Sequence, residues 1–180
     1  LPLMAAVAGG ADYVFTPEDP AGPGWQDDLA EHLRLGREAG RRESIVLVAE
    51  GAHDRDGNEL STQLIADTIQ ERTGEDARVT ILGHVQRGGT PSAYDRWMST
   101  LLGYAAVQEI LESTAEDEPV ILGVRRNRIT RVPLMKAVHD TRAVKDLIAA
   151  GDYAAAQASR GSSFSSMVGI NQILSTPPQL

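Results

Sequence analysis

Cysteine is absent from the 180 residues of this chain, so no disulfide can form within it and no thiol is available for chemistry. Thiol-based redox roles are therefore excluded, and a cysteine-free chain is typical of a cytoplasmic protein, which is the location we expect.

Long apolar runs are also missing. No stretch approaches eighteen consecutive apolar residues, and the apolar opening at residues 3–8 is too short for a membrane span or an ordinary signal peptide. We therefore expect no membrane association.

The chain has few basic residues relative to acidic ones: 17 Lys and Arg against 25 Asp and Glu, which gives a formal net charge of −8. Proteins that bind nucleic acids neutralise phosphates with clustered basic residues, so this balance argues against a nucleic-acid partner. If the chain binds an anion, a few local residues must do it. With 42% apolar and 23% charged residues, the composition predicts one soluble globular domain.

The chain begins at Leu1, without an initiator methionine and directly in an apolar run that has a helical character. Most intact domains begin instead with polar or poorly ordered residues. We therefore expect the sequence to be a fragment of a longer protein.

Short apolar segments of strand length alternate with longer segments of helical periodicity, and glycines or prolines separate them. The expected strands are residues 12–16, 44–49, 78–82 and 119–124, and the expected helices are residues 3–8, 25–39, 61–72, 91–111, 133–149 and 152–160. This alternation predicts an α/β fold with a largely parallel, Rossmann-like sheet and helices on both faces.

Polar residues follow two of the expected strands. Glu50 comes directly after residues 44–49, and the run HVQRGG occupies residues 84–89 after residues 78–82. Ligands of α/β proteins collect at the carboxyl ends of strands, and Arg, His and a glycine-rich helix start suit a phosphate. Glu50 would repel a phosphate and suits a hydroxyl. Together these residues predict a sugar-phosphate ligand.

The same region resembles the signature of the phosphofructokinases in every defined position. Residues 78–96 read RVTILGHVQRGGTPSAYDR, and four further segments match the family in the same order. Those segments are ADYVFTPE at 11–18, VLVAEGA at 46–52, VPLM at 132–135 and RGSSF at 160–164. The resemblance is closest to the catalytic half of the duplicated, eukaryotic-type ATP-dependent 6-phosphofructokinases. It fades beyond Phe164, so we expect a fructose 6-phosphate-binding lobe over residues 1–164 and a tail or linker over 165–180.

The resemblance implies a role for each matched position. Glu50 corresponds to the carboxylate that hydrogen-bonds the sugar hydroxyls, and the run His84-Val85-Gln86-Arg87 corresponds to the segment that holds the phosphate and sugar. Arg78 corresponds to an arginine that reaches the site of a neighbouring subunit, which implies a homo-oligomer. The expected substrate-binding residues are thus Glu50, Arg78, His84, Val85, Gln86 and Arg87.

The chain also departs from the family, because it lacks the glycine-rich nucleotide loop, the magnesium-holding stretch and the loop with the catalytic aspartate. The resemblance implies that ATP and Mg²⁺ are held by the missing half. We expect no catalytic residue and no metal ligand in this chain, and no phosphoryl transfer by the fragment alone, because that reaction needs donor, metal and acceptor assembled together.

Two other functions stay open at this point. The chain could be a regulatory half-domain that senses a sugar bisphosphate, or part of a relative that uses pyrophosphate instead of ATP. Residues in the missing half would distinguish the donors, while Arg87 favours the catalytic half, since the regulatory half usually has glutamine there.

Several residues also have structural interpretations. Glu50 could cap a helix, His84 could bond the backbone, and Arg78 could be a surface residue. Asp95 and Arg96 are interpreted as a helix-start carboxylate and its ion-pair partner, and are left out of the site. A further alternative places Asp12 and Arg41 in an effector site like that of bacterial relatives. The remaining histidines are interpreted as structural or solvated: His32, His53 and His139.

Overall fold

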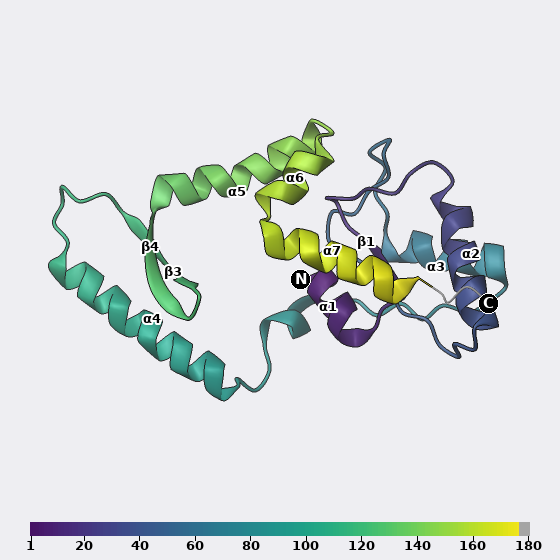
Figure 1. The fold of residues 1–180 in the computed structure, drawn as a ribbon, viewed down its shortest axis with the longest axis horizontal. Coiled ribbons are helices and arrows are strands. Elements are labelled where there is room, and N and C mark those ends of the chain that lie inside the picture. Colours follow the sequence, from purple (N-terminus) through teal and green to yellow (C-terminus); the bar gives the residue numbers. More distant parts are fainter. Residues whose placement is uncertain (177–180) are drawn as a thin grey trace. The chain divides into compact units, whose positions relative to one another are not determined.

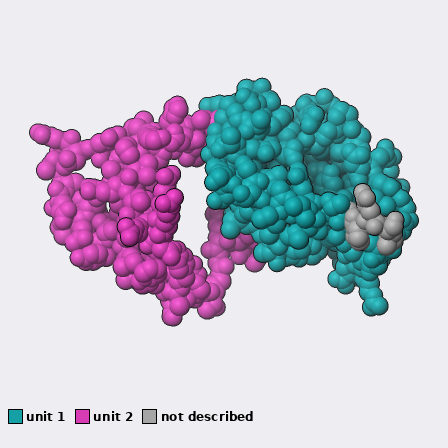
Figure 2. Space-filling view, viewed as in Figure 1, with its two compact units in different colours: residues 1–80, 146–180 teal, residues 81–145 magenta. Residues whose placement is uncertain are grey.

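The computed structural model describes residues 1–176, which form two compact units (Figures 1 and 2). Unit 1 comprises residues 1–80 and the chain from residue 146 onward, and unit 2 comprises residues 81–145. Unit 1 contains α1 (Pro2–Gly9), β1 (Tyr13–Phe15), α2 (Trp25–Glu38), β2 (Val46–Val48), α3 (Thr62–Thr73), α6 (Tyr153–Ser159) and α7 (Ser162–Ser175). Unit 2 contains the 3₁₀ turn η1 (Gly83–Arg87), α4 (Ala93–Glu112), β3 (Val120–Arg125) and β4 (Arg128–Pro133), and α5 (Leu134–Ala149) runs from unit 2 into unit 1.

The core of unit 1 forms around the parallel pair β1 and β2, in which Phe15 lies opposite Val48. Phe15 packs with Trp25 of α2 at a ring-centroid distance of 5.5 Å, and Leu29, one helical turn later, is completely buried. Ile65 of α3 joins the same cluster. Aromatic and branched side chains of this kind bury large apolar areas, so this cluster holds the strands and the two helices together.

Helices α1 and α7 pack together in the same unit, and α1 also contacts both strands (Figure 1). The two faces of a strand alternate along the chain, so Val14 points away from the core that Phe15 enters. Helices therefore contribute to both sides of the parallel pair, as the sequence predicts.

The predicted helix ends agree closely with the structure. The Ser61 hydroxyl oxygen accepts the Leu64 N–H at 3.1 Å at the start of α3, and Gly74 ends that helix at φ 75°. Asp152 accepts the Ala155 N–H at 3.0 Å at the start of α6. Such caps satisfy backbone groups that a helix leaves unpaired, which explains why short polar residues and glycine mark these ends in the sequence.

Two buried carboxylates link distant segments of unit 1. Asp12 pairs with Arg41 and also accepts the Ile45 N–H at 2.8 Å, so its carboxylate fastens β1 to the chain entering β2. Glu18 accepts two hydrogen bonds from the guanidinium of Arg160, at 3.0 and 2.7 Å. A charge taken out of water requires a partner, and each of these acids has one. Asp12 thus has a structural role here, whatever effector role the bacterial resemblance suggested.

Unit 2 is a hairpin packed on a long helix. Strands β3 and β4 are antiparallel, and α4 contacts both. The two residues of the turn, Arg126 and Asn127, have φ values of 50° and 60°. Positive φ at both central residues is the geometry of a type I′ turn, whose twist matches that of a hairpin.

The structure differs from the sequence-based expectation at three places. No strand is formed at residues 78–82, where a buried one was expected, and Ile81 is 79% exposed. A segment forms a strand only where it hydrogen-bonds to a neighbouring strand. In the described residues, β1 and β2 pair only with each other, so residues 78–82 have no strand partner. The expected strand at residues 119–124 is present, but its partner is the unpredicted antiparallel strand β4.

The third difference is at the C-terminal end, where residues 162–175 form α7 instead of a connector. This helix packs on α1 and also contacts α6, and such tertiary packing stabilises a helix that its local sequence signals only weakly. The last four residues of the expected tail, 177–180, lie outside the described residues. The α/β class itself is confirmed. Within residues 1–176, no helix has the length and apolarity required to cross a membrane.

Candidate functional site

Glu50 lies in a tight turn just past the carboxyl end of β2. The Ala52 N–H donates to the Ala49 carbonyl at 3.1 Å, and Gly51 between them has a φ of 78°, which favours glycine. Ala52 is buried and its carbonyl accepts the Leu60 N–H at 2.9 Å, so the far side of the turn is anchored in the core. The Glu50 side chain itself is exposed. The turn therefore presents a carboxylate to solvent on a fixed backbone.

The loop that follows Glu50 is closed by Asp54. Its carboxylate accepts the backbone N–H groups of Asp56 and Asn58 at 3.0 and 2.8 Å and the Asn58 side-chain amide at 2.9 Å. The Asn58 hydrogen bonds lower the pKa of Asp54, because they favour its ionised form. The loop beside Glu50 is thus held by its own polar groups.

The run His84-Val85-Gln86-Arg87 forms the single turn η1 in unit 2, and all four residues are exposed. The turn begins with the Val85 N–H donating to the Leu82 carbonyl at 2.9 Å. Glycines at both ends, Gly83 and Gly89, have positive φ. His84 and Arg87 therefore belong to one short turn bounded by such glycines, while their role in binding a phosphate stays a prediction.

Helix α4 begins five residues after η1 with a capping box. The Ser92 hydroxyl oxygen accepts the Asp95 N–H at 3.2 Å, and the Asp95 carboxylate accepts the Ser92 N–H at 2.8 Å. Hydrogen bonds from Ser92 also lower the pKa of Asp95. The interpretation of Asp95 as a helix-start carboxylate is therefore confirmed.

The predicted site is divided between the two units. Glu50 and Arg78 belong to unit 1, where Arg78 is exposed in an irregular segment, and residues 84–87 belong to unit 2. The structure brings His84 and Arg87 together in one turn, whereas the convergence of Glu50 and Arg78 with them stays a prediction. Within residues 1–176, no group of three or more His, Asp or Glu residues is arranged to hold a metal ion.

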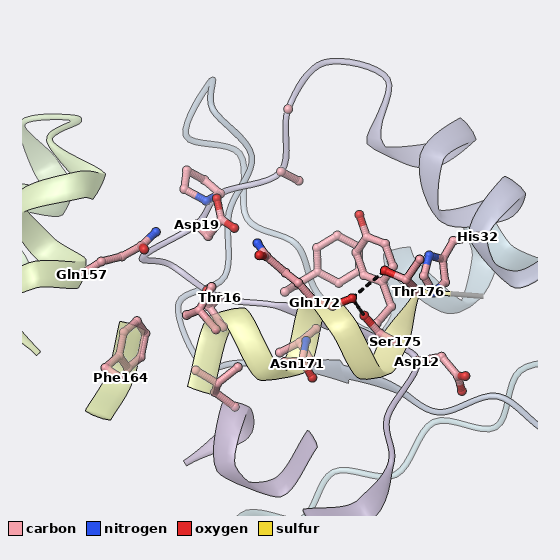
Figure 3. Close-up of a pocket in the computed structure, with 18 of the residues that line it drawn as sticks. Asp12, Thr16, Asp19, His32, Gln157, Phe164, Asn171, Gln172, Ser175 and Thr176 are labelled. Carbon is pink, nitrogen blue, oxygen red and sulfur yellow. Dashed lines mark hydrogen bonds between the residues drawn. The ribbon is translucent and has the colours of Figure 1, made fainter. Parts of the chain in front are cut away.

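A separate cavity of about 400 Å³ lies in unit 1 between β1, the loop after it and α7 (Figure 3). Asp19, Asn171 and Gln172 are among its polar lining residues. Burial raises the pKa of Asp19, and the charge of Arg55 opposes that shift. This cavity could not be predicted from the sequence, because it depends on α7, a segment expected to be a tail.

His32 borders the same cavity and forms an edge-to-face contact with Tyr13, with ring centroids 5.5 Å apart. Burial lowers the pKa of His32, and the nearby charge of Arg41 lowers it further. A histidine with a lowered pKa in the folded state binds protons more readily when unfolded, so protonation favours unfolding. Stability should therefore fall as the pH drops from about 7 to about 5 through the ordinary histidine range.

We expect His32→Gln to flatten this pH dependence, measured as the free energy of urea unfolding across that range. His139→Gln is the matched control, because the His139 side chain is 83% exposed. An unchanged slope in His32→Gln, or an equal change in both variants, would show that His32 does not cause the effect.

Comparison with known proteins places these features in a family. The family model described as Phosphofructokinase matches residues 1–110. An ATP-dependent 6-phosphofructokinase of Aspergillus niger is 46% identical over 165 residues, covering 91% of this chain and 21% of the relative. The liver-type ATP-dependent 6-phosphofructokinase of Homo sapiens is 40% identical over 181 residues, covering 99% of this chain and 23% of the relative.

The structures agree with the sequences. The T-state phosphofructokinase of Pichia pastoris superposes with a TM-score of 0.89 at 39% identity, covering 97% of this chain and 19% of that one. The chain spans about a fifth of the length of the curated relatives it matches. The resemblance stated from residues 78–96 is confirmed by these matches: the chain belongs to the phosphofructokinase family.

Proposed function

We propose that this chain is the fructose 6-phosphate-binding part of an ATP-dependent 6-phosphofructokinase, a cytoplasmic enzyme of glycolysis that makes fructose 1,6-bisphosphate. The observation that carries the proposal is the complete signature at residues 78–96, in a chain that also has a carboxylate exposed at the end of β2. The similarity to relatives named ATP-dependent 6-phosphofructokinase supports ATP as the donor.

The charges of the site residues set the orientation of the sugar. Arg87 and His84 can donate hydrogen bonds to a phosphate, and the Arg87 guanidinium carries the positive charge that a phosphate dianion favours. The Glu50 carboxylate repels a phosphate and accepts hydrogen bonds from hydroxyls. The phosphate should therefore face residues 84–87, with Val85 and Gln86 completing that segment, while the sugar hydroxyls face Glu50.

Arg78 is proposed to act in the site of a neighbouring subunit, which makes a homo-oligomer part of the functional enzyme. Arg78 is exposed in the described chain, which is compatible with that role, because a side chain that contacts a neighbouring subunit cannot be buried within its own subunit. The proposed enzyme thus binds each substrate phosphate with residues of two chains.

ATP and Mg²⁺ are proposed to bind elsewhere in the full enzyme, in the part that carries the glycine-rich nucleotide loop. Magnesium would neutralise charge on the transferred phosphoryl group when bound. The residues of this chain hold and orient the acceptor, which contributes to catalysis by fixing the reacting hydroxyl in position.

The test is a steady-state assay of the full-length protein with fructose 6-phosphate and either ATP or pyrophosphate, comparing wild type with Glu50→Gln. We expect turnover with ATP and a KM for fructose 6-phosphate raised by about tenfold or more in the variant, because hydrogen bonds to a charged group contribute about 1.5–3 kcal/mol. Glu59→Gln, an exposed glutamate of the same loop, is the control.

The alternatives give different results in the same assay. A regulatory half-domain predicts an unchanged KM in Glu50→Gln together with a weaker response to a sugar bisphosphate. Turnover with pyrophosphate and none with ATP would instead identify the pyrophosphate-using class. Either result would overturn the proposal.

A further inference from the structure

The tip of the β3–β4 hairpin concentrates positive charge in a chain whose net charge is negative. Arg125, Arg126 and Arg128 lie within four residues around the turn, and all three are exposed. The described residues provide no ion-pair partner for any of them, whereas Arg131, further along β4, pairs with Glu109 of α4. The tip is therefore a local positive patch.

Two features of the tip are unfavourable for the hairpin itself. Arg125 and Arg128 are directly cross-strand partners, and like charges in that position repel each other. Arg126 has a φ of 50°, a conformation that asparagine or glycine adopts more easily than arginine does. Residues that destabilise the hairpin at an exposed position indicate a functional role, such as binding, and not a role in stabilising the fold.

The geometry directs the arginine pair away from the helix. Arg131 contacts α4 through Glu109, and side chains alternate between the faces of a strand. Arg128 lies three residues before Arg131, so it and its partner Arg125 point from the opposite face. Next to them on that face are the small residues Gly123 and Thr130, which leave the surface beside the guanidinium groups uncrowded.

The tip also makes a side-chain hydrogen bond to α4. The Tyr94 hydroxyl of α4 donates to the Asn127 side-chain oxygen at 3.2 Å, and Tyr94 packs edge-on against Trp97 with ring centroids 6.1 Å apart. A pair of arginines on an anchored turn loses less freedom on binding than a pair on a mobile loop would.

We propose that Arg125 and Arg128 form a clamp for a phosphate group, separate from the site proposed for fructose 6-phosphate. Opposed residues of a hairpin have Cβ atoms about 4.5–5.5 Å apart, so two guanidinium groups can reach one anion between them. Each guanidinium can bind phosphate oxygens in a bidentate manner, and together they match the charge of a dianion. Arg126 adds positive potential at the tip. The phosphate could belong to inorganic phosphate, to a sugar phosphate or to a nucleotide.

The test measures how fast phenylglyoxal modifies each arginine of the full-length protein, with peptide mass spectrometry as the residue-specific readout. Inorganic phosphate at ten times its Kd should slow modification of Arg125 and Arg128 about tenfold by mass action. Arg142, an exposed arginine of α5 in the same unit, is the internal control and should react at an unchanged rate. Sodium chloride at equal ionic strength corrects for screening.

A second arm examines whether the two arginines act together. In Arg128→Gln, phosphate should no longer protect Arg125, and relief of the cross-strand repulsion should leave the hairpin folded. Separate titrations with fructose 1,6-bisphosphate and with ATP in the Arg87→Ala protein show which source of phosphate binds best. Because the readout is specific to the hairpin, failure of the fructose 6-phosphate site would not affect it.

Three results would overturn the proposed clamp. They are equal protection by chloride, equal protection of Arg142, and full protection of Arg125 in the Arg128→Gln variant. Protection by polyglutamate without protection by any phosphate compound would also overturn it, and would indicate an acidic protein partner instead.

Discussion

Arg87→Ala is expected to remove most of the thermal protection that fructose 6-phosphate gives the full-length protein. Arg87 ends the turn η1, is exposed, and carries the positive charge proposed to bind the substrate phosphate. Because a hydrogen bond to a charged group contributes about 1.5–3 kcal/mol, the loss of each contact should weaken binding by roughly 10- to 150-fold. The measurement is the shift of the melting temperature across a titration with the sugar phosphate.

Arg96→Ala is the matched control for this experiment. Arg96 is also exposed in unit 2, nine residues further along the chain, and it lies on α4 outside the proposed site. It should keep the full protection. Protection that survives in Arg87→Ala, or that disappears equally in both variants, would count against a phosphate site at residues 84–87.

Leu29→Ala is expected to produce the largest loss of stability among the changes considered. Leu29 is completely buried between Phe15 and the helices of unit 1, so truncation removes apolar contacts and leaves a cavity. Buried leucine-to-alanine changes cost about 2–5 kcal/mol, a large part of the roughly 5–15 kcal/mol that stabilises a typical domain. The free energy of urea unfolding measures the effect.

Leu35→Ala on the same helix is the control, because Leu35 is 39% exposed. Its change should stay within about 0.5 kcal/mol, as for most surface substitutions. Similar losses in both variants would mean that Leu29 does not occupy the centre of the core that the structure indicates.

Local signals in the sequence predicted the helices well. Ser61, Gly74 and Asp152 are cap residues whose preferences arise from hydrogen bonds and backbone angles within a few residues, so they can be recognised without knowledge of the tertiary structure. The turn at Glu50 is similarly local, because Gly51 alone marks the positive φ that it needs.

Contacts between distant segments were much harder to predict. The apolar run at residues 78–82 has the composition of a buried strand, but pairing depends on a neighbouring strand, which composition does not reveal. Residues 162–175 have a weak local signal as a helix, and their packing on α1 decides the outcome. The cavity beside His32 was missed for the same reason.

The sequence by itself determined the α/β class, the helix ends and the family, because caps, periodicity and an ordered motif depend on residues that are near one another in the chain. The roles of the candidate site residues stay a prediction. Only the tertiary structure decided that Asp12 fastens β1 to the approach of β2 and that Glu18 holds Arg160. Those pairings join residues whose separation in the chain carries no record of their distance in space, so folding alone brings them into contact.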